Sequence, residues 1–228
     1  MSYVFPPAAV PSVAVAGRAE RYAVRRIYCV GRNYADHAKE MGAAVERGTP
    51  MFFMKPADAL VTDGADVPYP SRTAELHHEV EMVVALGRGG RDIAVADALD
   101  HVYAYAVGLD LTRRDLQAAA KAKGHPWDTA KGFDASAPIS PLRTAAEIGH
   151  PARARLSLEV EGALRQETDI AHMLFPVAEI IHHLSQFWTL APGDLIYTGT
   201  PAGVAALARG DRFVARLDGV GELRGRIA

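Results

Sequence analysis

A short apolar run that carries two carboxylates constrains the fold of this chain more than any other feature. Residues 76–87, LHHEVEMVVALG, have the apolar and β-branched content of a strand, and the glycines of GRGG predict the turn that closes it. Glu79 and Glu81 are separated by one residue, so in a strand their side chains share one face. Because MVV follows directly, we expect both carboxylates to be partly buried.

Buried like charges must be compensated. Desolvating a carboxylate is expensive, so such a pair needs raised pKa values, cationic partners or a bound metal. An all-oxygen ligand set favours a hard cation such as Mg²⁺ or Mn²⁺, with positions left for water and substrate. The alternative is a solvated strand face, which is the commoner meaning of an E-x-E pattern taken alone. His77 shares this face, but a lone histidine is more often a packing residue, and we leave it outside the site.

The rest of the chain alternates between strand and helix patterns. We expect strands at residues 26–31, 51–55 and 101–111, and hairpins at residues 154–166 and at the tail around the Asp218–Gly219 turn. We expect helices at residues 33–41, 95–99, 113–124 and 175–190, with Gly42 and Gly124 ending the first and third. Asp110 then lies near a strand end, and the sequence predicts mixed strands and helices.

Composition excludes several classes of protein. The 228 residues and 49% hydrophobic content suit one large domain, and 25 Lys and Arg against 27 Asp and Glu give no reason to expect nucleic acid or a membrane as partner. Cys29 is the only cysteine, which excludes an internal disulfide and is compatible with a reducing compartment. No apolar run approaches the ~18 residues that span a bilayer, so we expect a cytoplasmic protein. Residues 1–20 form a proline-rich arm, extended around Val13 and Val15, and residues 21–228 one catalytic domain.

Several separated segments resemble the fumarylacetoacetate hydrolase family. They are CVGRNYADHAKEMG, FFMKPADALV, HHEVEMVVALG, YAVGLDLTRRDLQ, PWDTAKGFDASAPISP and PGDLIYTGTPAGV, and the match spans roughly residues 26–228. Within the family, MSYVFPP, LDLTRRDLQ and HPWDTAKGFD look most like bacterial fumarylpyruvate hydrolases and the wider acylpyruvases. The resemblance implies a β-rich α+β fold, a rolled mixed β-sandwich with short peripheral helices, assembled as a homodimer.

The resemblance also implies which residues hold the metal and activate water. The ligands of Mg²⁺ or Mn²⁺ fall on Glu79, Glu81 and Asp110, and a helical lid places a water-activating pair on His37 and Glu40. Residues three apart on a helix are neighbours on one face, so Glu40 can orient His37 while His37 takes a proton. Taken alone, the pair would more often be a surface contact. We expect the lid to close only over bound substrate.

Further positions of the family pattern contribute donors around the substrate. Those around the developing oxyanion fall on Arg114, Gln117 and Lys131, for which a solvated helix and a surface loop are the alternatives. Thr200, in the glycine-rich YTGTPAG turn, matches a residue that holds the substrate carboxylate. Weaker candidates for the substrate pocket, which could instead support the loops, are Lys55, Arg32 and Asn33.

The implied reaction is hydrolysis of a carbon–carbon bond in a 2,4-dioxo acid, a small-molecule 2-oxo acid substrate; fumarylpyruvate would give fumarate and pyruvate. Metal–enolate chemistry also suits oxaloacetate decarboxylation and the isomerisation or hydration of unsaturated 2-oxo diacids, and fold resemblance does not separate these reactions. A non-enzymatic metal-binding protein is the remaining alternative. A fumaryl group would need a cation at the far end of the pocket, for which the sequence offers Arg113, Lys121, Lys123 and Arg72 without choosing among them.

Overall fold

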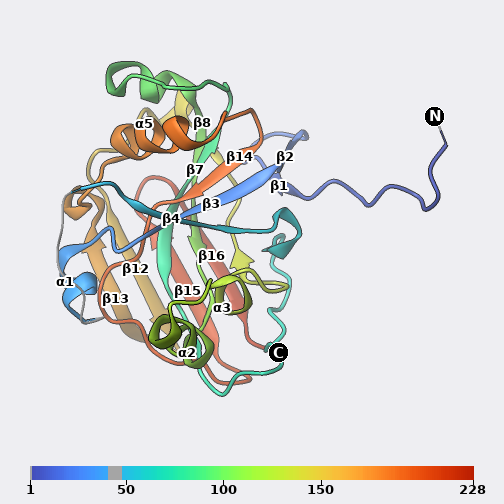
Figure 1. Ribbon diagram of the computed structural model, residues 1–228, viewed down its shortest axis with the longest axis vertical. Helices are drawn as coiled ribbons and strands as arrows, with labels where there is room; N and C mark the ends of the chain where they lie inside the picture. Colours follow the sequence, from blue (N-terminus) through green and yellow to red (C-terminus); the bar gives the residue numbers. More distant parts are fainter. Residues whose placement is uncertain (1, 41–47) are drawn as a thin grey trace.

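The computed structural model describes residues 2–40 and 48–228, and it has a β-rich α+β architecture (Figure 1). The strands are β1 (Ser12–Ala14), β2 (Arg21–Ala23), β3 (Arg26–Gly31), β4 (Met51–Lys55), β5 (Leu60–Val61), β6 (Leu76–His77), β7 (Val80–Leu86), β8 (Val102–Leu109), β9 (Thr112–Arg113), β10 (Ala137–Pro138), β11 (Arg143–Thr144), β12 (Arg155–Val160), β13 (Ala163–Asp169), β14 (Asp194–Tyr197), β15 (Arg212–Leu217) and β16 (Gly221–Arg226). The helices are α1 (Ala35–Glu40), α2 (Arg114–Lys123), α3 (Asp128–Lys131), α4 (Ala145–Ile148) and α5 (Val177–Phe187), with short 3-10 turns η1 (Ala57–Ala59), η2 (Val95–His101) and η3 (Ile170–His172).

The larger sheet has the strand order β11-β8-β7-β14-β3-β4. Its pairs are antiparallel except for β14 and β3, which run parallel. Every residue of β7 is buried, as expected of a central strand covered on both faces. Along β7, Met82 and Val84 face one hydrophobic cluster, whereas Val83 and Ala85 face the other. This period of two places Glu81 on the face of Val83 and Ala85.

The second sheet has the order β13-β12-β15-β16 and is antiparallel throughout. It packs on the larger sheet through β12, β15 and β16, which contact β7 and β8. Apolar residues from both sheets, such as Leu158 and Ala215 with Met82 and Val84, form one continuous core between the layers. The predicted mixed β-sandwich is therefore confirmed, as are the hairpins β12–β13 and β15–β16.

The helices lie at the margins of the sheets. Figure 1 shows α5 at one end of the molecule, and α2 and α3 near the other. Helix α5 buries Val177, Ile180 and Leu184 against the core, in agreement with the predicted spacing, but it ends before Trp188, whose backbone is extended. Helix α2 ends at Gly124, which has the left-handed φ of 66° that commonly closes a helix. None of the helices in the described residues is long and apolar enough to cross a membrane.

The start of the chain has two parts. Strand β1 pairs with β2, and Val13 and Val15 are buried. The predicted extended piece is therefore the first strand of a hairpin, and its second strand begins at Arg21, beyond the predicted arm. The residues before it project from the body, and Val4 and Phe5 are 92% and 80% exposed (Figure 1). The division into an arm and one catalytic domain stays a prediction. The predicted helix stop at Gly42 lies outside the described residues.

Candidate active site

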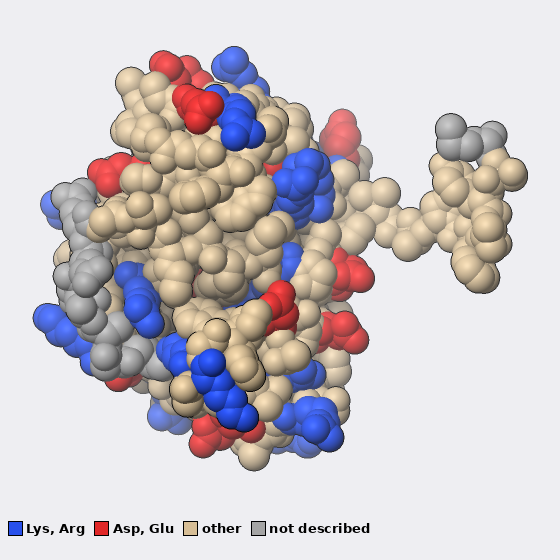
Figure 2. Space-filling model, in the orientation of Figure 1, with Lys and Arg blue, Asp and Glu red and all other residues tan. Residues whose placement is uncertain are grey.

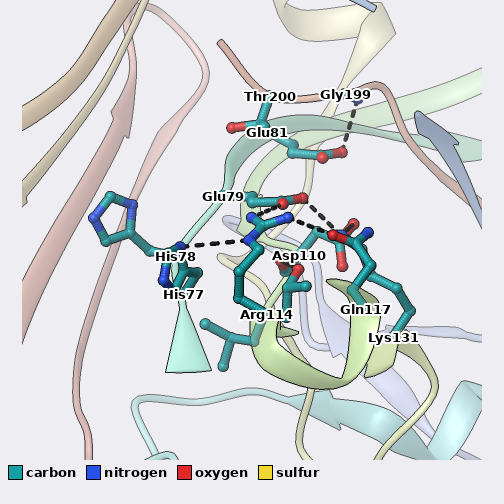
Figure 3. A network of polar contacts seen from close by, with 12 residues as sticks. His77, His78, Glu79, Glu81, Asp110, Arg114, Gln117, Lys131, Gly199 and Thr200 are labelled. Atoms are coloured by element: carbon teal, nitrogen blue, oxygen red, sulfur yellow. Dashed lines mark hydrogen bonds and ion pairs between the residues drawn. The ribbon is translucent and has the colours of Figure 1, made fainter. Parts of the chain in front are cut away.

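Three carboxylates converge where β7 and β8 lie side by side. Glu79 immediately precedes β7, Glu81 lies within it, and Asp110 directly follows β8. In the antiparallel register Glu81 lies opposite Gly108, and the Asp110 amide donates a 2.9 Å hydrogen bond to the Glu79 carbonyl. One oxygen from each side chain lies within 4.8 Å of the others. The register of two strands thus brings together groups that are about 30 residues apart in the chain (Figure 3).

Basic side chains compensate part of this buried charge. The three carboxylates are only 4%, 1% and 1% exposed. Lys131 Nζ lies 2.7 Å from both Glu79 Oε2 and Asp110 Oδ2, and Arg114 bonds the other oxygen of Glu79. Burial opposes ionisation of Glu79, yet Lys131 and Arg114 hold its pKa well below the usual range. Burial likewise opposes the charge of Lys131, but Asp110 and Glu79 raise its pKa.

The remaining oxygens fit a divalent cation. Burial and the neighbouring Asp110 and Glu79 raise the pKa of Glu81 well above its usual value, and within the described ranges its carboxylate is bonded only by the Gly199 amide, at 2.8 Å. Asp110 Oδ1 is buried without a hydrogen-bond donor, although Lys55 Nζ lies 2.9 Å away at ion-pair distance. Three converging carboxylates, of which Glu81 has no ion pair with a described residue, form an all-oxygen set that matches the ligand preference of hard cations.

The carboxylates form one wall of a cavity whose lining includes most of the predicted site residues. Besides the three acids, the predicted residues that line it are His37, Arg114, Gln117, Lys131, Thr200 and Arg32. Phe53 and Trp127 supply apolar walls, with ring centroids 6.0 Å apart. A cavity with a polar floor and aromatic sides suits a small anionic molecule that also has an apolar segment.

Helix α1 carries the predicted water-activating pair, of which His37 lines this cavity and the exposed Glu40 contacts His37 from outside the lining. His37 is 6% exposed, and its Nδ1 lies 3.2 Å from Glu40 Oε2. When Nδ1 donates to Glu40, Nε2 is the ring nitrogen that can accept a proton. Burial lowers the pKa of His37, against the Glu79 and Glu40 carboxylates that raise it, which favours the neutral base at neutral pH. Glu40 also accepts from the Gly203 amide at 3.1 Å, so it joins α1 to the loop after Thr200.

Helix α2 turns one face toward the cavity. Arg114, Gln117 and Lys121 follow at i, i+3 and i+7, which places them on one side of the helix, and all three line the cavity. Arg114 Nη1 donates to Gln117 Oε1 at 2.6 Å, and both side chains are buried. The alternative of a solvated helix is thereby excluded for Arg114 and Gln117, and burial likewise excludes a surface loop for Lys131.

Two of the weaker candidates lie outside the cavity lining. Asn33 uses its side-chain amide to bond Phe175 and Thr198, so it fixes two loops and has no amide group left for a substrate. Lys55 directs its ammonium to the carbonyls of Leu111 and Lys131 and to Asp110. Both side chains therefore support the site from behind, which is the alternative given for them, and their binding of substrate stays a prediction. Arg32 does line the cavity.

Gln166 on β13 is a buried contributor that the sequence did not reveal. Its Nε2 donates to Thr200 Oγ1 at 2.8 Å and to the Pro201 carbonyl at 2.9 Å. Its Oε1 lies 2.9 Å from His78 Nδ1 and 3.0 Å from the Val80 amide. One side chain therefore joins the start of β7, next to the carboxylates, to the loop of Thr200. No local signal marks a single glutamine in a strand, because only the fold shows which residues it meets.

Comparison with known proteins adds the family. The family model described as fumarylacetoacetate (FAA) hydrolase C-terminal matches residues 26–228. This chain belongs to the fumarylacetoacetate hydrolase family. The crystal structure of fumarylpyruvate hydrolase from Pseudomonas aeruginosa, in complex with Mn²⁺ and pyruvate, has 49% identity and a TM-score of 0.97, over 100% of this chain and 99% of that one.

Other members of the fumarylacetoacetate hydrolase family carry different activities in their names. Oxaloacetate tautomerase FAHD1 from Rattus norvegicus, a mitochondrial protein, is 45% identical over 203 residues, 89% of this chain and 91% of that protein. A 5-carboxymethyl-2-hydroxymuconate delta-isomerase from Mycobacterium smegmatis has 31% identity and a TM-score of 0.80, over 91% of this chain and 80% of that one. The chain is thus a metal-dependent enzyme of this family that acts on a small molecule, and its reaction must be argued from the site.

Proposed function

We propose that this chain is a hydrolase that cleaves the carbon–carbon bond of acylpyruvates, with fumarylpyruvate as substrate and fumarate and pyruvate as products. The observation that carries the proposal is that His37, whose Nδ1 contacts Glu40, lines the same cavity as the three carboxylates. Hydrolysis needs a base to activate water beside the group that holds the 2-oxo acid, and this cavity supplies both. The name of the Pseudomonas aeruginosa structure, with its bound Mn²⁺ and pyruvate, supports the same reaction.

The carboxylates provide the metal site of the proposal. Glu79, Glu81 and Asp110 would hold Mg²⁺ or Mn²⁺, which supplies Lewis-acid polarisation and orientation of a 2-oxo acid. Thr200 would bind the substrate carboxylate: its Oγ1 accepts from Gln166, so the hydroxyl hydrogen remains available to donate.

Water activation falls to His37. Its Nε2 accepts a proton from water while the water oxygen bonds to the C4 carbonyl carbon of the substrate. The bond between C3 and C4 then breaks, its electron pair stays with C3 as the pyruvate enolate, and the proton held by His37 returns to C3. Glu40 keeps the ring in position and stabilises its protonated form during the transfer.

Donors on α2 and α3 stabilise the negative oxygen that forms at C4. Arg114, Gln117 and Lys131 line the cavity and carry N–H groups, and the ammonium of Lys131 lies beside the carboxylates. Fixed donors in a buried site need little reorganisation when charge develops on the substrate, which lowers the barrier. The Glu79 and Asp110 carboxylates already hold Lys131 and Arg114 in place.

A second candidate function is tautomerisation of oxaloacetate, which the name of the Rattus norvegicus relative favours. It needs the same hold on a 2-oxo acid and one base, but no attack by water. Decarboxylation of oxaloacetate and isomerisation of an unsaturated 2-oxo diacid need the same site. The His37–Glu40 pair supplies an oriented base that either reaction can use, and the name of the Pseudomonas aeruginosa structure is what favours hydrolysis.

The test is a product assay on the purified protein after chelation and after addition of Mg²⁺ or Mn²⁺. We expect fumarate and pyruvate in equal amounts from fumarylpyruvate only when metal is present, and pyruvate with acetate from acetylpyruvate. Oxaloacetate in parallel, followed for carbon dioxide and for the rate of keto–enol exchange, separates the alternatives. No cleavage of either acylpyruvate, with rapid exchange of oxaloacetate, would replace the hydrolase with a tautomerase. No activity on any of these substrates would favour a non-enzymatic metal-binding protein.

Two expectations from the family resemblance remain part of the proposal. A homodimer is supported by β4, which is an edge strand of the larger sheet. It carries the exposed Met54, and its Phe52 contacts the exposed Phe187. Light scattering of the purified protein would give its mass in solution. The cytoplasm remains the expected location.

A further inference from the structure

Among the described residues, the cavity lining contains two cations that the proposed chemistry does not use. Lys121 lies on α2, one turn beyond Gln117 on the face that lines the cavity. Arg32 directly follows β3 and also lines the cavity. Figure 2 shows Lys and Arg side chains over the α2 region of the surface. Because Arg114 and Lys131 contact the carboxylates, Lys121 and Arg32 are the lining cations in residues 2–40 and 48–228 that are left to meet another part of a substrate.

Neither cation forms an ion pair with a described carboxylate. Lys121 is half-buried, and its ammonium lies 5.2 Å from the centroid of the Trp127 ring. Burial lowers the pKa of Lys121, and the charges of Arg114 and Arg32 lower it further. Positive charges that face one cavity repel one another, so an anion placed among them would be stabilised.

The structure also chooses among the four cations considered for the far end of the pocket. Arg113 stacks on Phe133, 4.4 Å from the ring centroid, and donates to the Thr129 carbonyl. Lys123 and Arg72 are exposed, and none of these three lines the cavity. Lys121 alone of the four does, and Arg32, although exposed, also lines it.

We propose that Lys121 and Arg32 form a subsite for a second carboxylate, which makes the enzyme selective for 2,4-dioxo acids with an acidic acyl group. The inference rests on the proposed hydrolase function and deepens it. The carboxylate–oxo end of the substrate lies at Glu79, Glu81 and Asp110. The apolar middle of the acyl chain passes Trp127 and Phe53, and its terminal carboxylate lies between the two cations. A substrate with an uncharged acyl end, such as acetylpyruvate, does not use the subsite.

The experiment compares kcat/KM for fumarylpyruvate and acetylpyruvate in metal-loaded enzyme. Lys121→Met keeps the apolar stem beside Trp127 and removes the charge. Arg32→Asn suits the left-handed backbone at φ 59°. The matched control is Lys123→Met, on the same helix but exposed and outside the cavity. We expect each cavity variant to lose about tenfold to a hundredfold in kcat/KM on fumarylpyruvate, mostly through KM, as for loss of one charge-assisted contact.

The same variants and the control should keep kcat/KM for acetylpyruvate, and their affinity for oxalate, within about twofold of wild type. Equal losses on both substrates, or no loss on fumarylpyruvate, would overturn the subsite while leaving the hydrolase proposal in place. Failure of the wild-type enzyme to cleave either substrate would instead overturn the proposed function, and with it this inference.

Discussion

Gln166 Nε2 donates a 2.8 Å hydrogen bond to Thr200 Oγ1, and this contact joins the second sheet to the loop that borders the candidate active site. The other bonds of the same amide reach the Pro201 carbonyl, the Val80 backbone amide and His78. The four contacts use the full donor and acceptor capacity of the glutamine. The positions of Thr200 and of the β7 carboxylates therefore depend on one buried side chain.

Gln166→Ala should lower both stability and substrate affinity. The change leaves the buried Val80 amide without its acceptor, and each such orphaned group costs about 1–3 kcal/mol. At about 2–4 °C per kcal/mol for a protein of this length, such a loss lowers Tm by roughly 2–12 °C. KM for an acylpyruvate should rise because Thr200 loses its fixed position. Gln186→Ala, at an exposed position of α5, is the control and should leave Tm and KM unchanged. An unchanged KM in Gln166→Ala would show that Gln166 does not position Thr200 for substrate binding.

Gly203 tests the contact between the loop after Thr200 and helix α1. Its φ is +96°, and a Cβ added there would lie 2.4 Å from the Arg165 carbonyl oxygen, so alanine must push the loop away. Gly210 has φ +95° with nothing within 4 Å of an added Cβ, which makes Gly210→Ala a control with the same backbone conformation. We expect Gly203→Ala to lower kcat more than Gly210→Ala does, because the Gly203 amide no longer holds Glu40. Equal kcat in the two variants would contradict this coupling.

Local sequence patterns were sufficient to predict the strands and helices whose buried faces follow from the spacing of their apolar residues. The strand at residues 26–31 agrees with β3, and the helix that Gly124 ends agrees with α2. The period of two in residues 76–87 correctly placed Glu79 and Glu81 together, because a strand has only two faces. Their meeting with Asp110 could be predicted only from the family resemblance, since the pairing register of β7 and β8 is a property of the fold.

Roles that depend on tertiary contacts could not be predicted in this way. Asn33 and Lys55 lie close in sequence to site segments, yet the fold directs their polar atoms to loop carbonyls. Gln166 acts through residues 34 to 88 positions away, which no local pattern encodes. Lys121 was one of four cations among which the sequence did not choose. The structure places it on the face of α2 that carries Arg114 and Gln117 and shows that this face lines the cavity.

The pH dependence of turnover should report on His37. A general base must be neutral to accept a proton, so activity falls as pH decreases through the pKa of His37. Burial lowers that pKa from the ordinary value of 6.5, against the opposing Glu79 and Glu40 carboxylates. We therefore expect the acidic limb of kcat/KM below pH 6.5.

Glu40→Gln tests the origin of this limb. Removing the carboxylate removes an interaction that raises the pKa, so the acidic limb should move to still lower pH. The plateau rate should fall as well, because the protonated ring loses its partner. An acidic limb that moves upward in Glu40→Gln, or does not move, would exclude His37 as the titrating base.

Asp110→Asn and His37→Gln separate the metal site from the base. Asp110→Asn preserves shape but removes one charge from the set of three carboxylates, so Mn²⁺ affinity and turnover should both fall. His37→Gln leaves the three carboxylates intact, and turnover should fall by about 10²–10⁴ with Mn²⁺ affinity unchanged. Calorimetric titration with Mn²⁺ measures affinity without requiring turnover. Because each variant serves as the control for the other, equal Mn²⁺ affinities in the two proteins would show that Asp110 is not a ligand. Weakened Mn²⁺ binding in His37→Gln would place His37 among the ligands and remove it as a free base.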